Sequence, residues 1–205
     1  TWACLPSATQ RSRFSCGWEA ARTRARLVAH ARRLFAKGGQ AAVGVIEVSK
    51  AAGVTTGALY HHFSRRQDLL RAVLEDVAGS VATRALEAME GTEDPWARLM
   101  LGVNAVLDAC LEDDVRLAYN EAASILGLDE WRALEESKTG VLLVQGLMAV
   151  AATGKLKPVS LELLAAMVKG AVVEGAMSIT RAKHPKKLRR EAGELLQALM
   201  DGLRA

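Results

Sequence analysis

The residues whose types could do chemistry gather in one short segment, from Thr55 to His61. It holds two threonine hydroxyls, a phenol and an imidazole beside Gly57, and each of these polar groups can donate or accept hydrogen bonds. Phenol and hydroxyl groups bind phosphate oxygens, and threonine can also contact base edges or thymine methyl groups. This combination indicates binding to a nucleic acid.

Motifs that support catalysis or metal binding are missing from the sequence. There is no GxxxxGK[ST], GxGxxG, GxSxG or HExxH pattern, and the three cysteines have no CxxC spacing. Glu112, Asp113 and Asp114 are adjacent carboxylates, but consecutive helical positions point in different directions. We therefore predict no enzyme activity, no metal site and no cofactor.

Three short helices are expected to position the Thr55–His61 segment. Apolar residues recur at helical spacing over 22–37, and two glycines follow. A second helix is expected over 45–52, ended by Gly53, and a third begins after Thr55 as its N-cap. A helix, a tight glycine turn and a second helix make a helix-turn-helix, whose last helix can enter the DNA major groove.

The charge of the chain is concentrated at one end. Residues 1–66 carry eleven Lys or Arg against two acidic residues, a net charge of +9, whereas 67–205 carry sixteen against twenty-one, a net charge of −5. A basic module on an acidic body is typical of proteins that bind a polyanion, although a solvated basic face would give the same distribution. Residues 1–21 show no periodicity, and we expect a disordered basic leader there.

The rest of the chain predicts further helices and no strand, because no segment shows sustained alternation of apolar and polar residues. Ser64, Asp94 and Ser160 are the expected N-caps of three of these helices. We predict an all-α protein with a helix-turn-helix domain over 22–66 and a larger helical domain over 67–205. The expected helices cover 65–89, 95–111, 114–126, 129–152, 161–183 and 185–203.

One motif resembles a known family. The runs 52–55 and 57–63, followed by Arg66 and by leucines at 69–70, resemble the DNA-binding signature of tetracycline-repressor (TetR) regulators. The resemblance is strong over about 22–70, and the segment 121–131 is similar to a C-terminal domain type of some members. It implies a ligand-released dimeric repressor that binds double-stranded DNA in the cytoplasm.

By this resemblance, several residues map onto DNA contacts, with Arg66 as a phosphate clamp. Tyr60 and Phe63 could instead be core aromatics, and His62 could serve in packing. Arg22, Arg24 and Arg26 would add nonspecific attraction to phosphate, or form a solvated face. The implied DNA contacts are Lys50, Thr55, Thr56, Gly57, Tyr60, His61 and Arg66.

The sequence departs from the family pattern at four positions. Gln40 stands where an aromatic is usual, Gly44 where Ser or Thr is usual, and Ser49 where Ala is usual. The first removes a core anchor, and the others weaken a cap and a packing position. Arg66 replaces the usual Lys and keeps its positive charge.

By the same resemblance, the last two helices are expected to pack against those of a second copy as a four-helix bundle, which makes a homodimer. Two recognition helices would then lie about 34–36 Å apart, which predicts a palindromic operator. Alternatively, the apolar residues along these two helices belong to the ordinary core of the domain. The expected interface residues are Val168, Val172, Gly175, Ile179, Leu195 and Leu199.

A pocket for a small-molecule effector is expected among the middle helices, where apolar bulk mixes with a few polar groups. Its lining would suit a mostly apolar molecule, although Met and aromatic residues at helical spacing are also typical of core. The expected lining residues are Trp96, Met100, Asn104, Tyr119, Trp131, Met148 and Met167.

Two other functions are possible for such a fold. The first is an all-α enzyme, which the sequence does not support because it has no catalytic motif. The second is an interaction module that no longer binds DNA, but such a protein would be expected to lose the 55–63 segment first. No apolar run reaches the ~18 residues of a membrane span, so no membrane partner is expected.

Overall fold

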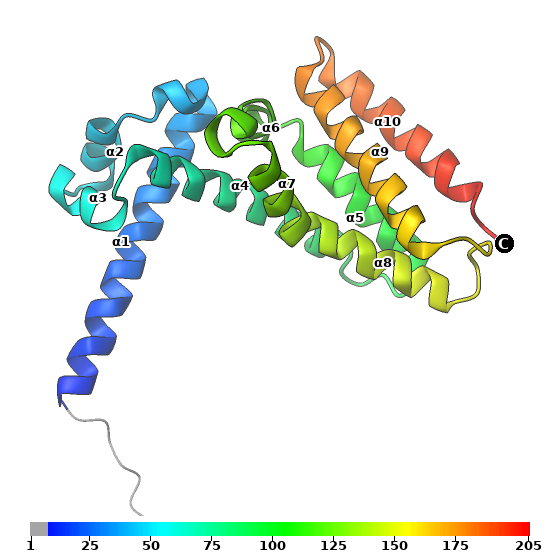
Figure 1. The fold of residues 1–205 in the computed structure, drawn as a ribbon, viewed down its shortest axis with the longest axis horizontal. Helices are drawn as coiled ribbons and strands as arrows, with labels where there is room; N and C mark the ends of the chain where they lie inside the picture. The colour runs from blue at the N-terminus through cyan, green and yellow to red at the C-terminus, as the bar shows by residue number, and fades with distance from the viewer. Residues whose placement is uncertain (1–7) are drawn as a thin grey trace, which may run out of the picture.

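Helices build both parts of the chain in the computed structural model, which describes residues 8–205, with side chains from Trp18 onward. The N-terminal part contains α1 (Ala8–Gly38), the 3-10 turn η1 (Gly39–Ala42), α2 (Val45–Ala52) and α3 (Thr56–His62). The long helix α4 (Arg66–Ala88) runs from this part into the larger body (Figure 1).

The body is a layered set of helices beside α4. In Figure 1, α9 and α10 lie side by side at the far end, and α8 runs along the lower edge. Within residues 8–205 the only extended pairing is an isolated bridge between Leu156 and Arg204, which confirms the all-α prediction. The body contains α5 (Pro95–Ala109), α6 (Asp113–Leu126), α7 (Leu128–Glu135), the π-helical turn η2 (Glu136–Gly140), α8 (Val141–Ala152), α9 (Leu161–Arg181) and α10 (Pro185–Asp201).

Side-chain caps fix the starts of three helices. The side chains of Thr55, Asp94 and Ser160 each accept a hydrogen bond from the backbone N–H three residues later, as the sequence predicts. The expected cap at Ser64 is wrong. There α4 begins one residue later, because the Asp68 carboxylate accepts a bond of 2.9 Å from the Arg65 N–H and satisfies that donor from inside the helix.

The first helix is longer than predicted. It begins at Ala8, so the expectation of a disordered leader is wrong for residues 8–21, and residues 1–7 lie outside the described residues. An established helix gains one hydrogen bond for each residue added, and no proline lies between 8 and 38. The missing apolar stripe therefore does not prevent helix formation.

A π-helical turn divides the helix predicted over 129–152. The turn η2 separates α7 from α8, and its last residue, Gly140, is buried. A β-carbon at Gly140 would lie 2.9 Å from the Glu136 carboxyl group, so the turn brings these two positions together. Such turns often occur at functional sites.

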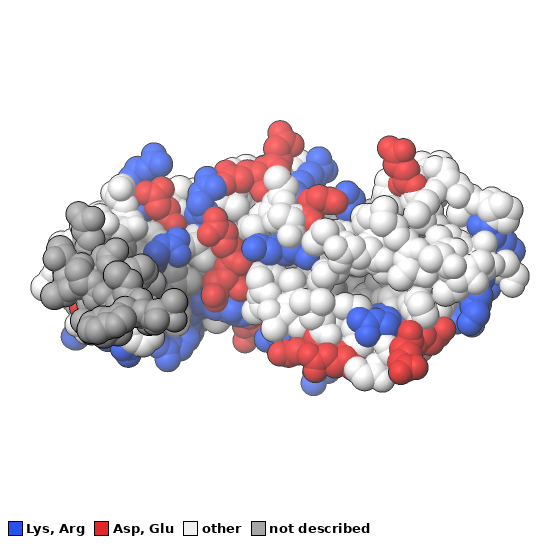
Figure 2. Space-filling model, turned by 90° about the horizontal axis from the view of Figure 1, so that it is seen from below, with Lys and Arg blue, Asp and Glu red and all other residues white. Residues whose placement is uncertain are grey.

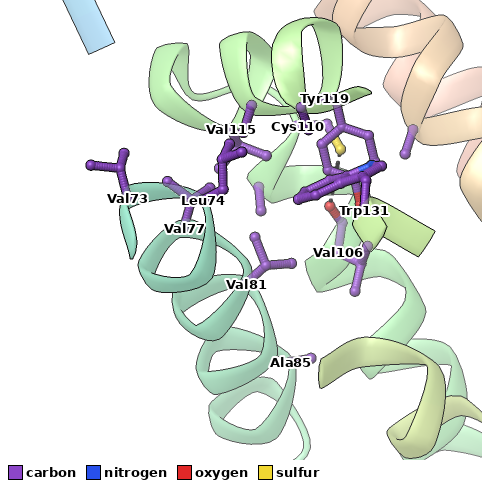
Figure 3. Packing of buried hydrophobic residues seen from close by; sticks show 14 of the residues in the cluster. Val73, Leu74, Val77, Val81, Ala85, Val106, Cys110, Val115, Tyr119 and Trp131 are labelled. Atoms are coloured by element: carbon purple, nitrogen blue, oxygen red, sulfur yellow. Dashed lines mark hydrogen bonds between the residues drawn. The ribbon is translucent and has the colours of Figure 1, made fainter. Parts of the chain in front are cut away.

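The core of the body packs against one face of α4. In Figure 3, Val77 and Val81 of α4 point toward Val115 of α6, and Trp131 of α7 lies beside Tyr119. The rings of Tyr119 and Trp131 are 5.6 Å apart at 84°, a favourable edge-to-face arrangement. The α4 helix is therefore held along its length by the body.

Arg32 connects the N-terminal part to the body. From α1, its guanidinium donates to Asp76 of α4 at 2.8 Å and to Asp114 of α6 at 2.6 Å. It also donates to the Ser80 hydroxyl at 2.9 Å. Because Asp114 is mostly shielded from water, this cluster holds α1, α4 and α6 in one relative position.

A second polar joint lies between η1 and α6. The Gln40 N–H donates to the Glu121 carboxylate at 2.6 Å, and its side-chain amide donates to the Ser124 hydroxyl at 3.0 Å. Gly39 has a φ of +61°, and a β-carbon there would overlap the Glu121 carboxyl group. Gln40 thus replaces an apolar anchor with hydrogen bonds between the two parts.

Replacing Arg32 with Met should lower the free energy of unfolding by about 2 kcal/mol, because Asp114 would lose its buried partner. Arg33→Met is the matched control, since Arg33 is exposed on the same helix and should change stability by less than about 0.5 kcal/mol. Urea unfolding followed by circular dichroism measures both. Equal losses in the two variants would contradict the role given to Arg32.

Candidate nucleic-acid interface and effector cavity

The predicted DNA-reading residues share one exposed face of α3. Thr56 and Tyr60 are one helical turn apart, as are Gly57 and His61, and all four are exposed. Leu59 points to the opposite side and is fully buried. The helix therefore presents a continuous row of hydroxyl, backbone, phenol and imidazole groups to solvent.

The two aromatic residues of the motif have different environments. Tyr60 is 49% exposed, so it is not a core aromatic, whereas Phe63 is 2% exposed and packs in the core. Arg24 of α1 lies over the Phe63 ring, with its guanidinium carbon 5.0 Å from the ring centroid. Burial, His61 and Arg24 together lower the pKa of His62. Burial is the largest of these causes.

A small core beneath α3 fixes its angle to α2. Val48, Ala52 and Leu59 are buried, and Val54 is half-buried against them. Gly53 has a φ of +66°, a left-handed conformation that glycine adopts most easily, and it makes the turn between the helices. The local sequence thus forces α3 to project from the domain.

The remaining N-terminal contacts lie close to this face. Lys50 is exposed on α2. The Thr55 hydroxyl oxygen accepts the Ala58 N–H at 3.1 Å, which leaves its own O–H free to donate. Ser49 is buried but donates to the Val45 carbonyl at 2.8 Å, so the departure from Ala leaves no unpaired group. Gly44 caps α2 without a side-chain bond.

Arg66 does not have the geometry of a free phosphate clamp. Its Nε donates to the Val43 carbonyl at 2.9 Å, and its terminal nitrogen Nη2 donates to the Gln40 carbonyl. The guanidinium therefore binds the backbone before α2, and it ties this segment to the start of α4. The neighbouring Arg65 side chain is 79% exposed, and its contact with Asp68, at 3.4 Å, is long and open to solvent, so Arg65 is a more accessible cation, which the sequence reasoning missed.

The body contains a cavity of about 310 Å³. Residues of α4, α5, α8 and α9 give it walls of carbon, while α7 and η2 contribute one polar wall. The lining includes one valine of α5 and the polar or charged side chains of the cavity wall: Val103, Tyr119, Arg132, Glu135, Glu136 and Lys169.

The predicted pocket is largely wrong in detail. All seven expected residues lie in the described part of the chain, and of these Tyr119 alone lines the cavity. Trp96, Met100 and Trp131 are buried in the core, whereas Met148 and Met167 point to solvent, and Asn104 donates to the Met100 carbonyl. Helical spacing alone could not tell which face each helix turns inward.

Glu135 is the main cavity residue that sequence reasoning missed. It lines the cavity together with Tyr119, and burial raises the pKa of Glu135 against the opposing effects of Tyr119 and Arg132. Burial also raises the pKa of Tyr119 well above its usual value. One signal was available: Glu135 comes one helical turn after the buried Trp131, on the inward side of α7.

The expected dimer stripe divides between core and surface. Val168 and Ile179 are buried within the body, Val172 lines the cavity, and Gly175 lies near Leu107. Those four therefore do not offer a free surface. Leu195 and Leu199 on α10 are 63% and 55% exposed, as an interface would require.

Leu163 and Met167 form the exposed apolar row of α9 in place of the expected residues. They lie near the start of α9 and beside the end of α10, because the two helices run antiparallel (Figure 1). Figure 2 shows a broad face of the body with few charged side chains. By length and composition α9 could cross a membrane, but a third of that stretch is buried in the protein.

Two family models cover the two parts. The model described as "Bacterial regulatory proteins, tetR family" matches residues 27–73, and "Tetracyclin repressor-like, C-terminal domain" matches 96–203. The chain belongs to the tetracycline-repressor family. The TetR N-terminal match contains the whole exposed row of α3, and the C-terminal match contains most of the cavity lining.

Known TetR proteins agree with this membership. The chain is 28% identical over 147 residues to the HTH-type transcriptional regulator HbdR of Aromatoleum sp. (69% of this chain, 63% of HbdR). It is 39% identical over 59 residues to TtgR of Pseudomonas putida, which covers 29% of this chain and 28% of TtgR. The matched parts thus span less than two thirds of these relatives.

A solved TetR-family structure extends the similarity to almost the whole fold. A regulator from Pectobacterium atrosepticum superposes with a TM-score of 0.75 at 25% identity, over 91% of this chain and 96% of that one. The two-part architecture described above is therefore that of the TetR family.

Replacing Arg66 with Ala should lower the free energy of unfolding by about 2 kcal/mol, because two carbonyl groups lose a charged donor. Arg65→Ala is the matched control and should change it by less than about 0.5 kcal/mol, since that side chain is exposed. Urea unfolding of both variants decides the point. Unchanged stability in Arg66→Ala would restore it as a free cation.

Proposed function

We propose that this TetR-family chain is a sequence-specific DNA-binding transcriptional regulator, and that it acts as a homodimeric repressor in the cytoplasm, released by a small effector. The observation that carries the proposal is the exposed α3 face, which has no role in the core. The named relatives are transcriptional regulators, which favours this function over an enzyme.

The proposed contacts follow from exposure and chemistry. Thr56 and Gly57 stand where side-chain methyl, hydroxyl and backbone groups can approach base edges in the major groove. Tyr60, Thr55 and His61 can donate to phosphate oxygens. Lys50 and Arg65 supply positive charge at the two sides of α3, and Arg65 takes the phosphate role first expected of Arg66.

The proposed dimer uses the exposed rows of α9 and α10. Leu163 and Met167 with Leu195 and Leu199 make an apolar surface of the kind that homodimers bury. A two-fold axis there would present two α3 helices about one DNA turn apart, and the operator would be a palindrome.

The proposed effector site is the cavity beside α4. Ala85 and Met89, near the end of α4, line it, while the start of α4 is bonded through Arg66 to the segment before α2. A mostly apolar effector would bind more tightly to a dimer whose α3 helices are wrongly spaced for DNA. It would lower DNA affinity by up to the ratio of its affinities for the wrongly spaced and the DNA-binding dimer. The α4 helix would transmit this change from the cavity to α3.

The experiment that tests the proposed function is selection of DNA from a randomised pool by the purified protein at near-physiological salt. We expect enrichment of a palindrome with half-sites about one helical turn apart. Failure to enrich any motif would favour an interaction module that keeps the fold without reading DNA.

Substitutions of Thr56 in α3 and of Arg65 at the start of α4 should separate specificity from general affinity. On the selected DNA, Thr56→Ala should change which base is preferred at one position, at a cost of about 1–3 kcal/mol. Arg65→Ala should weaken binding to every sequence and reduce the salt slope by about one unit. Fluorescence anisotropy over a salt series measures both; a change of base preference in Arg65→Ala alone would reverse the two assignments.

A charge placed in the apolar rows should break the dimer. We expect Leu199→Glu to yield monomers and to weaken DNA binding at least tenfold, because a buried, unpaired carboxylate costs several kcal/mol. Arg190→Gln on the same helix is the control, since Arg190 is exposed and lies on the opposite side of α10 from Leu199. Sedimentation velocity gives the oligomeric state, and dimers of unchanged affinity in Leu199→Glu would exclude this interface.

A further inference from the structure

The chemistry of the cavity narrows the kind of molecule that it accepts. We propose that its ligand is a small, mostly apolar molecule whose polar end donates hydrogen bonds to Glu135, as an amine or a hydroxyl does, and that it is not a carboxylate. This proposal rests on the proposed function only in taking the cavity as the effector site.

The apolar part of the ligand would be held by four helices. Ala85 of α4, Val103 and Val106 of α5, Leu143 of α8 and Val173 of α9 all line the cavity, and none of them offers a side-chain hydrogen bond. Transfer of hydrocarbon from water to such walls gains about 25 cal/mol per Å². A ligand without an apolar body would leave this gain unused.

The polar end of the ligand would lie at the α7 and η2 wall. Tyr119 of α6 and Glu135 of α7 both line this part of the cavity. A carboxylate has two oxygens and accepts about four hydrogen bonds, so Glu135 has capacity for a donor from the ligand beside the Tyr119 hydroxyl. A ligand that brings a donor to Glu135 would compensate the cost of its burial.

The other charged groups at the cavity do not offer an equal partner for Glu135. Lys169 of α9 is paired with Glu136 of η2. Arg132 is exposed to solvent one turn before Glu135, and its attraction does not outweigh the effect of burial on the Glu135 pKa. A donor inside the cavity would therefore act where screening by water is weaker.

A carboxylate group on the ligand would be repelled at this wall, whereas a hydrogen-bond donor would be attracted. Glu135 and Glu136 are adjacent and both line the cavity, so an anion placed among them would be repelled. The two cations of this wall are Lys169, whose charge is already compensated by Glu136, and Arg132, which is exposed to solvent where its attraction is screened. The polar wall thus discriminates by charge, while the carbon walls select an apolar body.

Three probes with one ring system test the proposal: 2-naphthylmethylamine, 2-naphthylmethanol and 2-naphthoate. Binding to the full chain without DNA is measured by isothermal titration at pH 7. We expect the amine or the alcohol to bind at least tenfold more tightly than the naphthoate. A tenfold ratio of affinities corresponds to a difference of about 1.4 kcal/mol in binding free energy.

Substitutions assign the binding to Glu135 and separate the two donor types. Glu135→Gln keeps the side-chain size and one acceptor, so amine binding should weaken on the order of tenfold or more. Binding of the alcohol should weaken less than about threefold, because a hydroxyl can still donate to the side-chain oxygen of Gln. Glu87→Gln, an exposed carboxylate of α4 outside the cavity, should change neither.

A cavity-filling variant locates the probes. Val103→Phe adds a ring where the cavity is empty and should abolish binding of all probes, with thermal unfolding as the check of its fold. The proposal is overturned if the naphthoate binds as tightly as the other two, if no probe binds, or if Glu135→Gln changes neither amine nor alcohol binding. None of these results touches DNA reading by α3, which the selection experiment decides separately.

Discussion

The bonds of Arg32 to Asp76 and Asp114 set the geometry on which the rest of the structure depends. They join one helix of the N-terminal part to two helices of the body, and Asp114 is nearly removed from solvent. Val48, Ala52 and Leu59 beneath α3 belong to the same apolar cluster as the core of the body. The position of α3 relative to the body is therefore fixed by these polar contacts together with a continuous apolar core, in which Leu27 and Phe35 of α1 and Leu70 of α4 are fully buried.

The same joint explains how a cavity in the body can affect α3 at a distance. The α4 helix lines the cavity near its end, packs on the body core in its middle and carries Arg66 at its start (Figure 3). Gln40 and Glu121 make a parallel connection through α6. A ligand that binds two positions of α4 or α6 with different affinities would change the position of the attached helix-turn-helix, and this difference in affinity sets the coupling between the two sites.

Local signals in the sequence were sufficient for the helix-turn-helix and for most helix boundaries. Thr55, Asp94 and Ser160 cap their helices as expected, since a cap depends only on residues within one turn. The exposed face of α3 follows from the position of Leu59 alone. These features could be predicted because they depend on neighbouring residues.

Features that depend on distant partners were not predictable in this way. Arg66 was expected to meet phosphate, but carbonyls of Gln40 and Val43, more than twenty residues earlier, bind it in the fold. The inward faces of the body helices depend on which helices they meet, and the π turn changes the register between α7 and α8. For that reason Glu135 was missed and six of the seven expected pocket residues lie elsewhere.

In the proposed complex, two copies of the chain read DNA with their α3 helices on one face of the duplex. Hydroxyl-radical footprinting of the dimer on a selected fragment tests this arrangement. We expect two protected patches on one face of the DNA, related by two-fold symmetry and separated by about one helical turn. A single patch, or protection spread evenly along the fragment, would contradict it.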